Sequence, residues 1–174
     1  IATKFNTDYN NDYFILPEPI IPKYVARVMS LRDGSKKMSK SEESDLSRIN
    51  LTDTKDQIVQ KIKKAKTDNE PISENIFEEN SIRYEAQNLI KIYSNLKSET
   101  IDKVLNDFNG KKFSDFKKNL SELLVEKINP ISKKINQYRS DDKELINILK
   151  DGSEKANDTA EKTILEIKKI VGLL

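Results

Sequence analysis

Residues 114–138, SDFKKNLSELLVEKINPISKKINQY, carry the longest apolar stripe of this 174-residue chain. Its apolar residues recur every three or four positions, the spacing of one face of an α-helix, and are Phe116, Leu120, Leu123, Leu124, Ile128, Ile131, Ile135 and Tyr138. Such a stripe mainly indicates a buried face. Pro130 lies within it and is expected to kink or split the helix, because proline removes one backbone hydrogen bond. The stretch therefore predicts a mainly α-helical fold.

Shorter apolar stripes of helical spacing lie on both sides of this stretch. They predict helices within residues 54–65, 86–93, 101–108, 145–149 and 156–171. Thr54 or Asp53 is expected to cap the first helix, and Gly110 and Gly152 are expected to end the third and the fourth. Residues 71–80 show little periodicity and predict a loop. Amphipathic helices joined by short polar turns predict a helical bundle with these stripes in its core.

A different pattern precedes residue 45. Residues 13–16 form a brief apolar run stopped by Pro17, as expected of a strand that enters a turn. Residues 26–31 lie between Pro22 and Gly34 and are predicted to be the last buried strand of a parallel sheet. Because ligands bind at the carboxyl ends of the strands in such sheets, the loop that follows is a candidate binding segment.

That loop, residues 36–41, reads KKMSKS. Lysine is a compact charge with three donors, and serine offers a hydroxyl and an unhindered backbone N–H, so the run suits the oxygens of a polyphosphate such as that of ATP. Gly34 and Ser35, just before the run, are expected to give the loop the freedom of a hinge. The alternative interpretation is a solvated basic loop without a ligand.

The composition restricts the other possibilities. With 31 basic and 29 acidic residues the formal net charge is +2, so any contact with RNA must be local. The chain has no cysteine and no histidine, which argues against disulfides and against a structural zinc site, so no metal ligand is expected. No apolar run approaches the roughly 18 residues of a membrane span, so a cytoplasmic protein without membrane contact is expected.

Residues 37–41 match the KMSKS signature of class I aminoacyl-tRNA synthetases, and their surroundings resemble the tryptophanyl-tRNA synthetase family. The similar segments are residues 16–23, 26–31, 61–68 and 152–157. The resemblance covers the whole chain but only part of the family's protein, since a HIGH-like motif and an amino-acid pocket have no counterpart here. The chain begins without Met inside a predicted helix, so it is expected to be the C-terminal half.

The resemblance implies two regions. Residues 1–45 would be the C-terminal part of a Rossmann-like α/β catalytic domain, namely its last strands and the KMSKS loop. Residues 46–174 would be an α-helical tRNA anticodon-binding domain with the C-terminal helix. The resemblance assigns no residue to tRNA contact. The lysine-rich face of residues 61–66 is one candidate, and a solvated face is the alternative.

The activity implied by the resemblance is ATP-dependent attachment of tryptophan to its tRNA, tRNA(Trp), through an aminoacyl-adenylate. Mg²⁺ would be carried with ATP and would not sit in a protein cage. The full-length enzyme would be a homodimer that includes the missing N-terminal half. The chain on its own is predicted to be inactive, because binding cannot replace the absent positioning groups.

The site residues come from the positions that match the family's motif. The implied ATP-binding residues are Val28, Lys37, Met38, Ser39, Lys40 and Ser41. Lys37 and Lys40 would be catalytic, because they would stabilise the negative charge that grows on the departing pyrophosphate. The two serines would position its oxygens, and the backbone of Val28 and Met38 would border the adenine end of the nucleotide.

Two alternatives stay open. Tyrosyl-tRNA synthetases share the general plan and a related lysine loop, so the chain could come from a tyrosine-specific relative, although residues 26–31 and 152–157 favour tryptophan. The other alternative is a non-catalytic helical RNA-binding or adaptor module. Such a module would have no need for the lysine loop and the segment that leads into it.

Overall fold

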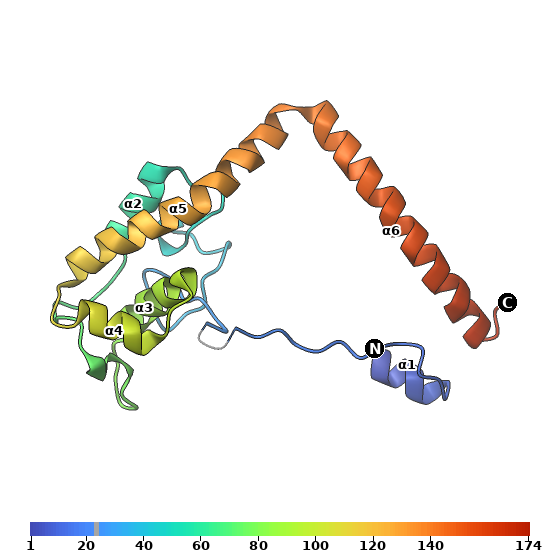
Figure 1. The fold of residues 1–174 in the computed structure, drawn as a ribbon, viewed down its shortest axis with the longest axis horizontal. Helices are drawn as coiled ribbons and strands as arrows, with labels where there is room; N and C mark the ends of the chain where they lie inside the picture. Colours follow the sequence, from blue (N-terminus) through green and yellow to red (C-terminus); the bar gives the residue numbers. More distant parts are fainter. Residues whose placement is uncertain (23–24) are drawn as a thin grey trace. The chain divides into compact units, whose positions relative to one another are not determined.

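The computed structural model describes residues 1–22 and 25–174 and has a mainly helical fold (Figure 1). Its α-helices are α1 (Ala2–Asp8), α2 (Lys55–Lys64), α3 (Tyr84–Lys97), α4 (Ile101–Phe108), α5 (Phe113–Ser140) and α6 (Asp142–Ile170). Two 3-10 turns, Asp45–Ser47 and Glu74–Phe77, lie between them in the sequence. Lys23, the last residue of the segment 16–23 that resembles the synthetases, lies outside the described residues.

The chain divides into two compact units. One is Ile21–Gln137, and the other combines Ile1–Ile20 with Tyr138–Leu174. The lysine loop and α2, α3 and α4 belong to the first unit, together with most of α5. The division into residues 1–45 and 46–174 stays a prediction.

The core of the unit Ile21–Gln137 is built from the predicted stripes. Its almost completely buried side chains include Ile58, Ile62, Leu89, Ile90, Val104, Phe116 and Leu120. The ring of Phe116 packs against those of Phe108 and Tyr93, with centroids 4.9 and 5.3 Å away. Ile72 and Ile76, from the segment predicted to be a plain loop, are also fully buried, and Ile76 lies in a 3-10 turn. The bundle core is thus confirmed for α2 to α5, while the loop prediction for residues 71–80 misses two core residues.

Local signals set the ends of these helices. The Thr54 hydroxyl accepts the Gln57 N–H, and the Gln57 side chain accepts the Thr54 N–H, so both residues cap α2. The Thr100 hydroxyl accepts a backbone N–H in the same way at the start of α4. Gly110, after α4, has a φ of 72°. The predicted cap at Thr54 and the predicted stop at Gly110 are therefore confirmed.

Two predicted interruptions are wrong in part or entirely. Pro130 lies inside α5 without splitting it, since the helix continues to Ser140. Gly152 lies inside α6, which runs without a break where the sequence predicts two helices. Gly152 does not adopt the positive φ of a terminating glycine. A glycine in a helix interior costs only about 1 kcal/mol relative to alanine, so the flanking helix-forming residues outweigh it.

The apolar stripe of α6 is not buried, contrary to the prediction that residues 145–149 and 156–171 contribute to the core. None of the residues of α6 is buried, and Ile146, Leu149, Ile164 and Leu165 are exposed. An amphipathic pattern indicates a face that favours burial, but burial itself requires a covering segment, and the described residues leave most of this face exposed. None of the described helices is long and apolar enough to cross a membrane.

The two predicted strands are also absent from the described residues. In residues 13–16, the backbone N–H and C=O of Phe14 both bond to the side chain of Asn6, at 3.1 and 2.8 Å. Residues 26–31 contain one antiparallel bridge, between Met29 and Lys37. A strand needs the backbone of a neighbouring strand along its length. Phe14 bonds to a side chain instead, and residues 26–31 pair with residues 36–38 at only one bridge, while Leu31 bonds to the backbone of Ser47 and Lys66.

Candidate functional site

The lysine loop leaves a short antiparallel pairing. The Ser30 N–H donates to the Lys36 carbonyl at 2.8 Å, and the Met38 N–H donates to the Val28 carbonyl at 3.1 Å. These bonds hold residues 28–30 beside residues 36–38. The loop therefore starts from an antiparallel turn within the described residues and not from the end of a parallel sheet.

Gly34 lies at the turn of this pairing and is buried. A Cβ atom there would lie 2.6 Å from the backbone of both Tyr84 and Glu85, at the start of α3. The residue therefore permits a close approach to α3, and it is not the free hinge that the sequence suggests. Beside it, the carboxylate of Asp33 accepts the hydroxyl and the N–H of Ser35, at 2.6 and 3.1 Å. These hydrogen bonds lower the pKa of Asp33.

A cavity of about 620 Å³ lies at the lysine loop. Five of the six predicted ATP-binding residues line it, namely Val28, Lys37, Met38, Ser39 and Lys40. The sixth, Ser41, is not among the lining residues, but its hydroxyl lies 2.9 Å from the Ser39 hydroxyl. Ala26, Arg27 and residues 48–52 complete the lining. The sequence assigned none of them a role in the site, because residues 48–52 carry no motif and only the fold brings them to the loop.

The two predicted catalytic residues are cations without a partner in the part of the chain that the structure describes. Lys37 and Lys40 are exposed, and their ammonium groups have no hydrogen bond or ion pair within residues 1–22 and 25–174. In contrast, the Lys36 ammonium lies 3.3 Å from the Asp33 carboxylate. Two unpaired ammonium groups on one cavity can bind a polyanion. The described residues contain no cluster of three or more acidic, His or Cys side chains that could hold a metal ion.

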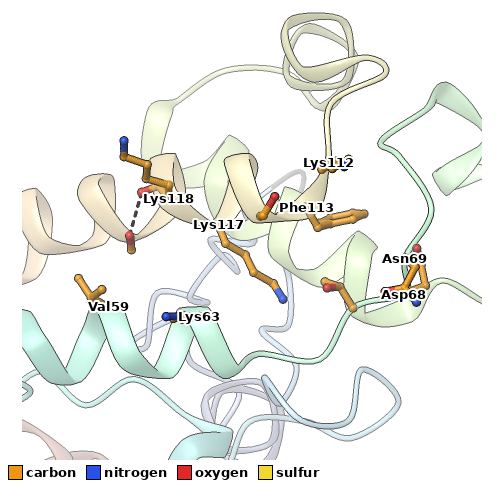
Figure 2. A pocket seen from close by; sticks show the side chains of 11 residues that line it. Val59, Lys63, Asp68, Asn69, Lys112, Phe113, Lys117 and Lys118 are labelled. Atoms are coloured by element: carbon orange, nitrogen blue, oxygen red, sulfur yellow. Dashed lines mark hydrogen bonds between the residues drawn. The ribbon is translucent and has the colours of Figure 1, made fainter.

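A second cavity, of about 510 Å³, lies between the end of α2 and the start of α5 (Figure 2). We call it the lysine pocket, because four lysines line it: Lys63, Lys112, Lys117 and Lys118. Val59 and Phe113 give it apolar lining. A cavity that combines apolar surface with several cations can accept a nucleobase together with its phosphates.

Two polar groups of the lysine pocket are fixed by neighbours. The Lys117 ammonium donates to the Ala65 carbonyl at 2.8 Å, and burial lowers the pKa of Lys117. The Asp68 carboxylate accepts two hydrogen bonds from the Arg83 guanidinium, at 2.7 and 2.8 Å. Burial alone would raise the pKa of Asp68, but the bonds from Arg83 and from the Glu70 N–H outweigh it and hold that pKa below its ordinary value. Asp68 therefore stays an ionised acceptor.

The fold divides the lysine-rich face of residues 61–66. Lys61 is buried, with its ammonium 2.6 Å from the Asp53 carboxylate, and Lys66 lies 2.7 Å from a Glu85 oxygen. Lys63 belongs to the lysine pocket. The other three lysines of the pocket lie within residues 112–118, far along the chain, so periodicity in the segment 61–66 gave no sign of them.

The chain is similar in sequence to class I tRNA synthetases. The family model of class I tRNA synthetases (W and Y) matches residues 1–129. The chain is 51% identical over 173 residues to a tryptophan–tRNA ligase of Caulobacter vibrioides, covering 99% of this chain and 50% of that protein. A tryptophan–tRNA ligase of Brucella melitensis is 41% identical over 193 residues, covering 100% of this chain and 54% of that protein. The chain thus spans about half the length of the curated relatives it matches.

Solved structures give the same result. A tryptophanyl-tRNA synthetase from Mycoplasma pneumoniae has a TM-score of 0.79 and 26% identity, covering 98% of this chain and 50% of that one. The enzyme from Campylobacter jejuni, complexed with ADP and tryptophan, has a TM-score of 0.60 and 24% identity, which shows a likeness of fold alone. The family predicted from residues 37–41 is confirmed, and the chain belongs to the class I tRNA synthetases of the tryptophan and tyrosine group.

Proposed function

We propose that the chain is part of a tryptophan–tRNA ligase, which activates tryptophan with ATP and transfers it from the adenylate to tRNA(Trp). The observation that carries this proposal is the pair of cations Lys37 and Lys40, which are unpaired among the described residues, on a cavity that Val28, Met38 and Ser39 also line, in a chain of this family. The relatives described above are tryptophan–tRNA ligases, which supports tryptophan over tyrosine.

The two lysines act on the leaving group. The tryptophan carboxylate attacks the α-phosphorus of ATP, the bond between the α-phosphorus and the bridging oxygen breaks, and negative charge grows on pyrophosphate. Lys37 and Lys40 would neutralise that charge, and preorganised donors aimed at developing charge lower the barrier. The hydroxyls of Ser39 and Ser41 would donate to phosphate oxygens. Mg²⁺ would accompany the phosphates of ATP, because it keeps water and phosphate ligands in such sites.

The division of the chain forms part of the same proposal. Residues 1–45 would complete a Rossmann-like catalytic domain, together with the part of the relatives' length that this chain does not span. Ile15 and Ile20 are 92% and 97% exposed, as expected of apolar side chains that another segment covers. Residues 46–174 would form the anticodon-binding domain of a cytoplasmic homodimer.

The tRNA would bind the helical region at the lysine pocket. Its four lysines can contact phosphates of the RNA backbone, which supply most of the affinity in such complexes. Asp68 can accept hydrogen bonds from a base edge, and Asn69 can both donate and accept them. The pocket thus combines positioning groups with groups that can read a base.

Tryptophan-dependent exchange of pyrophosphate into ATP, measured in the complete enzyme, tests the function. We expect exchange with tryptophan and none with tyrosine, and we expect none from the 174-residue chain alone. Exchange with tyrosine only would overturn the tryptophan assignment. Binding of tRNA without any exchange would instead favour the non-catalytic RNA-binding module.

A further inference from the structure

A buried cation joins α2 to the segment that follows the lysine loop. Lys61 of α2 is 3% exposed, and its Nζ lies 2.6 Å from Oδ2 of Asp53 and 2.7 Å from Oδ2 of Asp45. Asp45 begins the 3-10 turn after the loop, and Asp53 precedes α2. One ammonium group therefore holds two carboxylates from different parts of the segment between the loop and α2.

A second cation extends these contacts to the loop itself. Nη2 of Arg48 lies 3.0 Å from Oδ1 of Asp45, and Nη1 of Arg48 donates to the Glu42 carbonyl at 2.9 Å. Glu42 directly follows Ser41, the last residue of the KMSKS motif. The contacts thus run from Lys61 through Asp45 and Arg48 to the end of the lysine loop.

The network is balanced in charge, with two cations and two carboxylates. Asn50 joins it, because its side-chain amide donates to Asp45 at 3.0 Å and its backbone N–H donates to Asp53 at 2.9 Å. Buried ion pairs add little net stability, since each charge gives up its water, whereas breaking one leaves an uncompensated charge. Such a network can fix the orientation of the groups it joins.

We propose that Lys61 is a positioning residue for the lysine loop in the reaction described above, and the inference rests on that proposed function. Lys61 holds Asp45, and through Arg48 it holds the Glu42 carbonyl, so that the loop leaves its cavity along one path. Arg48 also lines the cavity that contains Lys37 and Lys40. A displaced Arg48 would therefore change both the end of the loop and the wall of the cavity.

The substitution Asp45→Asn tests this proposal without disturbing the buried pair, because it removes the outer carboxylate and leaves Lys61 bound to Asp53. In the complete enzyme we expect kcat of tryptophan-dependent pyrophosphate exchange to fall roughly tenfold, as for the loss of one charge-assisted hydrogen bond. The Kd for tryptophan and the melting temperature should stay near those of the wild type. Asp56→Asn, at an exposed acid in the first turn of α2, is the matched control and should have no effect.

A second pair of variants addresses Lys61 directly. Lys61→Met keeps the apolar stem and removes the charge, so it should lose at least as much activity as Asp45→Asn, and Lys61→Arg should restore part of it. Wild-type kcat and KM for ATP in Asp45→Asn would overturn the proposal. So would losses of activity that only follow losses of folded protein. If the wild-type enzyme shows no tryptophan-dependent exchange, the proposed function fails and this inference fails with it.

Discussion

The side-chain amide of Asn88 binds both backbone groups of Met29. Its Oδ1 accepts the Met29 N–H at 2.9 Å, and its Nδ2 donates to the Met29 carbonyl at 2.8 Å. Asn88 lies on α3 and is only 3% exposed, so water cannot readily replace it. The amide therefore stands in for a neighbouring strand, and it fixes to α3 the segment that pairs with the lysine loop.

Replacement of Asn88 by leucine should destabilise the fold by about 1–3 kcal/mol, because it leaves the part-buried N–H and C=O of Met29 without partners. Asn95→Leu is the matched control, since Asn95 is exposed on the same helix, and it should change the stability by less than about 0.5 kcal/mol. Urea unfolding of the 174-residue chain measures both. Equal losses in the two variants would contradict the role of the amide.

Alanine substitutions at two glycines should have opposite effects. Gly34→Ala places a methyl group 2.6 Å from the backbone of α3 and should destabilise by about 1–3 kcal/mol. Gly152→Ala meets no atom within 4 Å and removes a glycine from the interior of α6, so it should stabilise by about 1 kcal/mol. Thermal unfolding of the two variants compares them. A stabilising Gly34→Ala would mean that the turn does not need the close approach to α3.

The pair of Asp68 and Arg83 should make stability depend on pH. The pKa of Asp68 lies below its ordinary value, because the bonds from Arg83 outweigh the effect of burial. A carboxyl group whose pKa is lower in the folded than in the unfolded chain stabilises the fold above the unfolded pKa. That contribution is lost as the pH falls through the folded pKa. Asp68→Asn should therefore lower the urea midpoint at pH 7, and the difference from wild type should vanish once the pH has fallen below the folded pKa of Asp68, where both side chains are neutral. A difference that persists at low pH would show another cause.

Sequence patterns predicted the helices correctly where a local signal and a covering partner coincide. Thr54 caps α2 through Gln57, and Phe116 lies in a core that α3 and α4 complete. The patterns misjudged α6, because the spacing of Ile164 and its neighbours reports amphipathicity and not the presence of a partner. The strand at residues 26–31 failed for a similar reason, since the backbone of Met29 bonds to the side chain of Asn88, which periodicity cannot reveal.

The candidate site also has residues that the sequence predicts and residues that it does not. Residues 37–40 could be predicted because they form one local motif, and they line one cavity. Residues 48–52 could not be predicted to line that cavity, because only folding brings them beside the loop. Lys117 likewise bonds to the Ala65 carbonyl at the end of α2, although the two residues are 52 positions apart in the sequence. A local motif is visible in one sequence, whereas the cavity walls that distant segments supply become visible only in the fold.

The lysine pocket predicts a salt-dependent contact with tRNA. Lys112→Gln and Lys118→Gln should each weaken binding of tRNA(Trp) to the complete enzyme and reduce the slope of log K against log salt by roughly one, if each lysine contacts one phosphate. Lys127→Gln is the control, because Lys127 lies on α5 but does not line the pocket. Filter binding over a series of salt concentrations measures the slopes. An equal change in the control would indicate that only the overall charge matters.

Replacement of Lys37 or Lys40 by alanine in the complete enzyme should slow adenylate formation far more than it weakens tryptophan binding. Both ammonium groups are unpaired within the described residues and line the cavity of the lysine loop. The loss of one preorganised contact with developing charge costs about 3–4 kcal/mol, or roughly 10² to 10³ in rate. Ground-state affinity for ATP should change less, since contacts made equally in both states would not raise kcat.

Lys36→Ala is the internal control, because the Lys36 ammonium pairs with Asp33, and its effect should be about tenfold or smaller. Single-turnover kinetics separate the three variants. A site that contacts the leaving pyrophosphate should distinguish Lys37 and Lys40 from Lys36. Small and equal losses of rate at all three positions would therefore show that the loop is a basic surface and not a phosphate site.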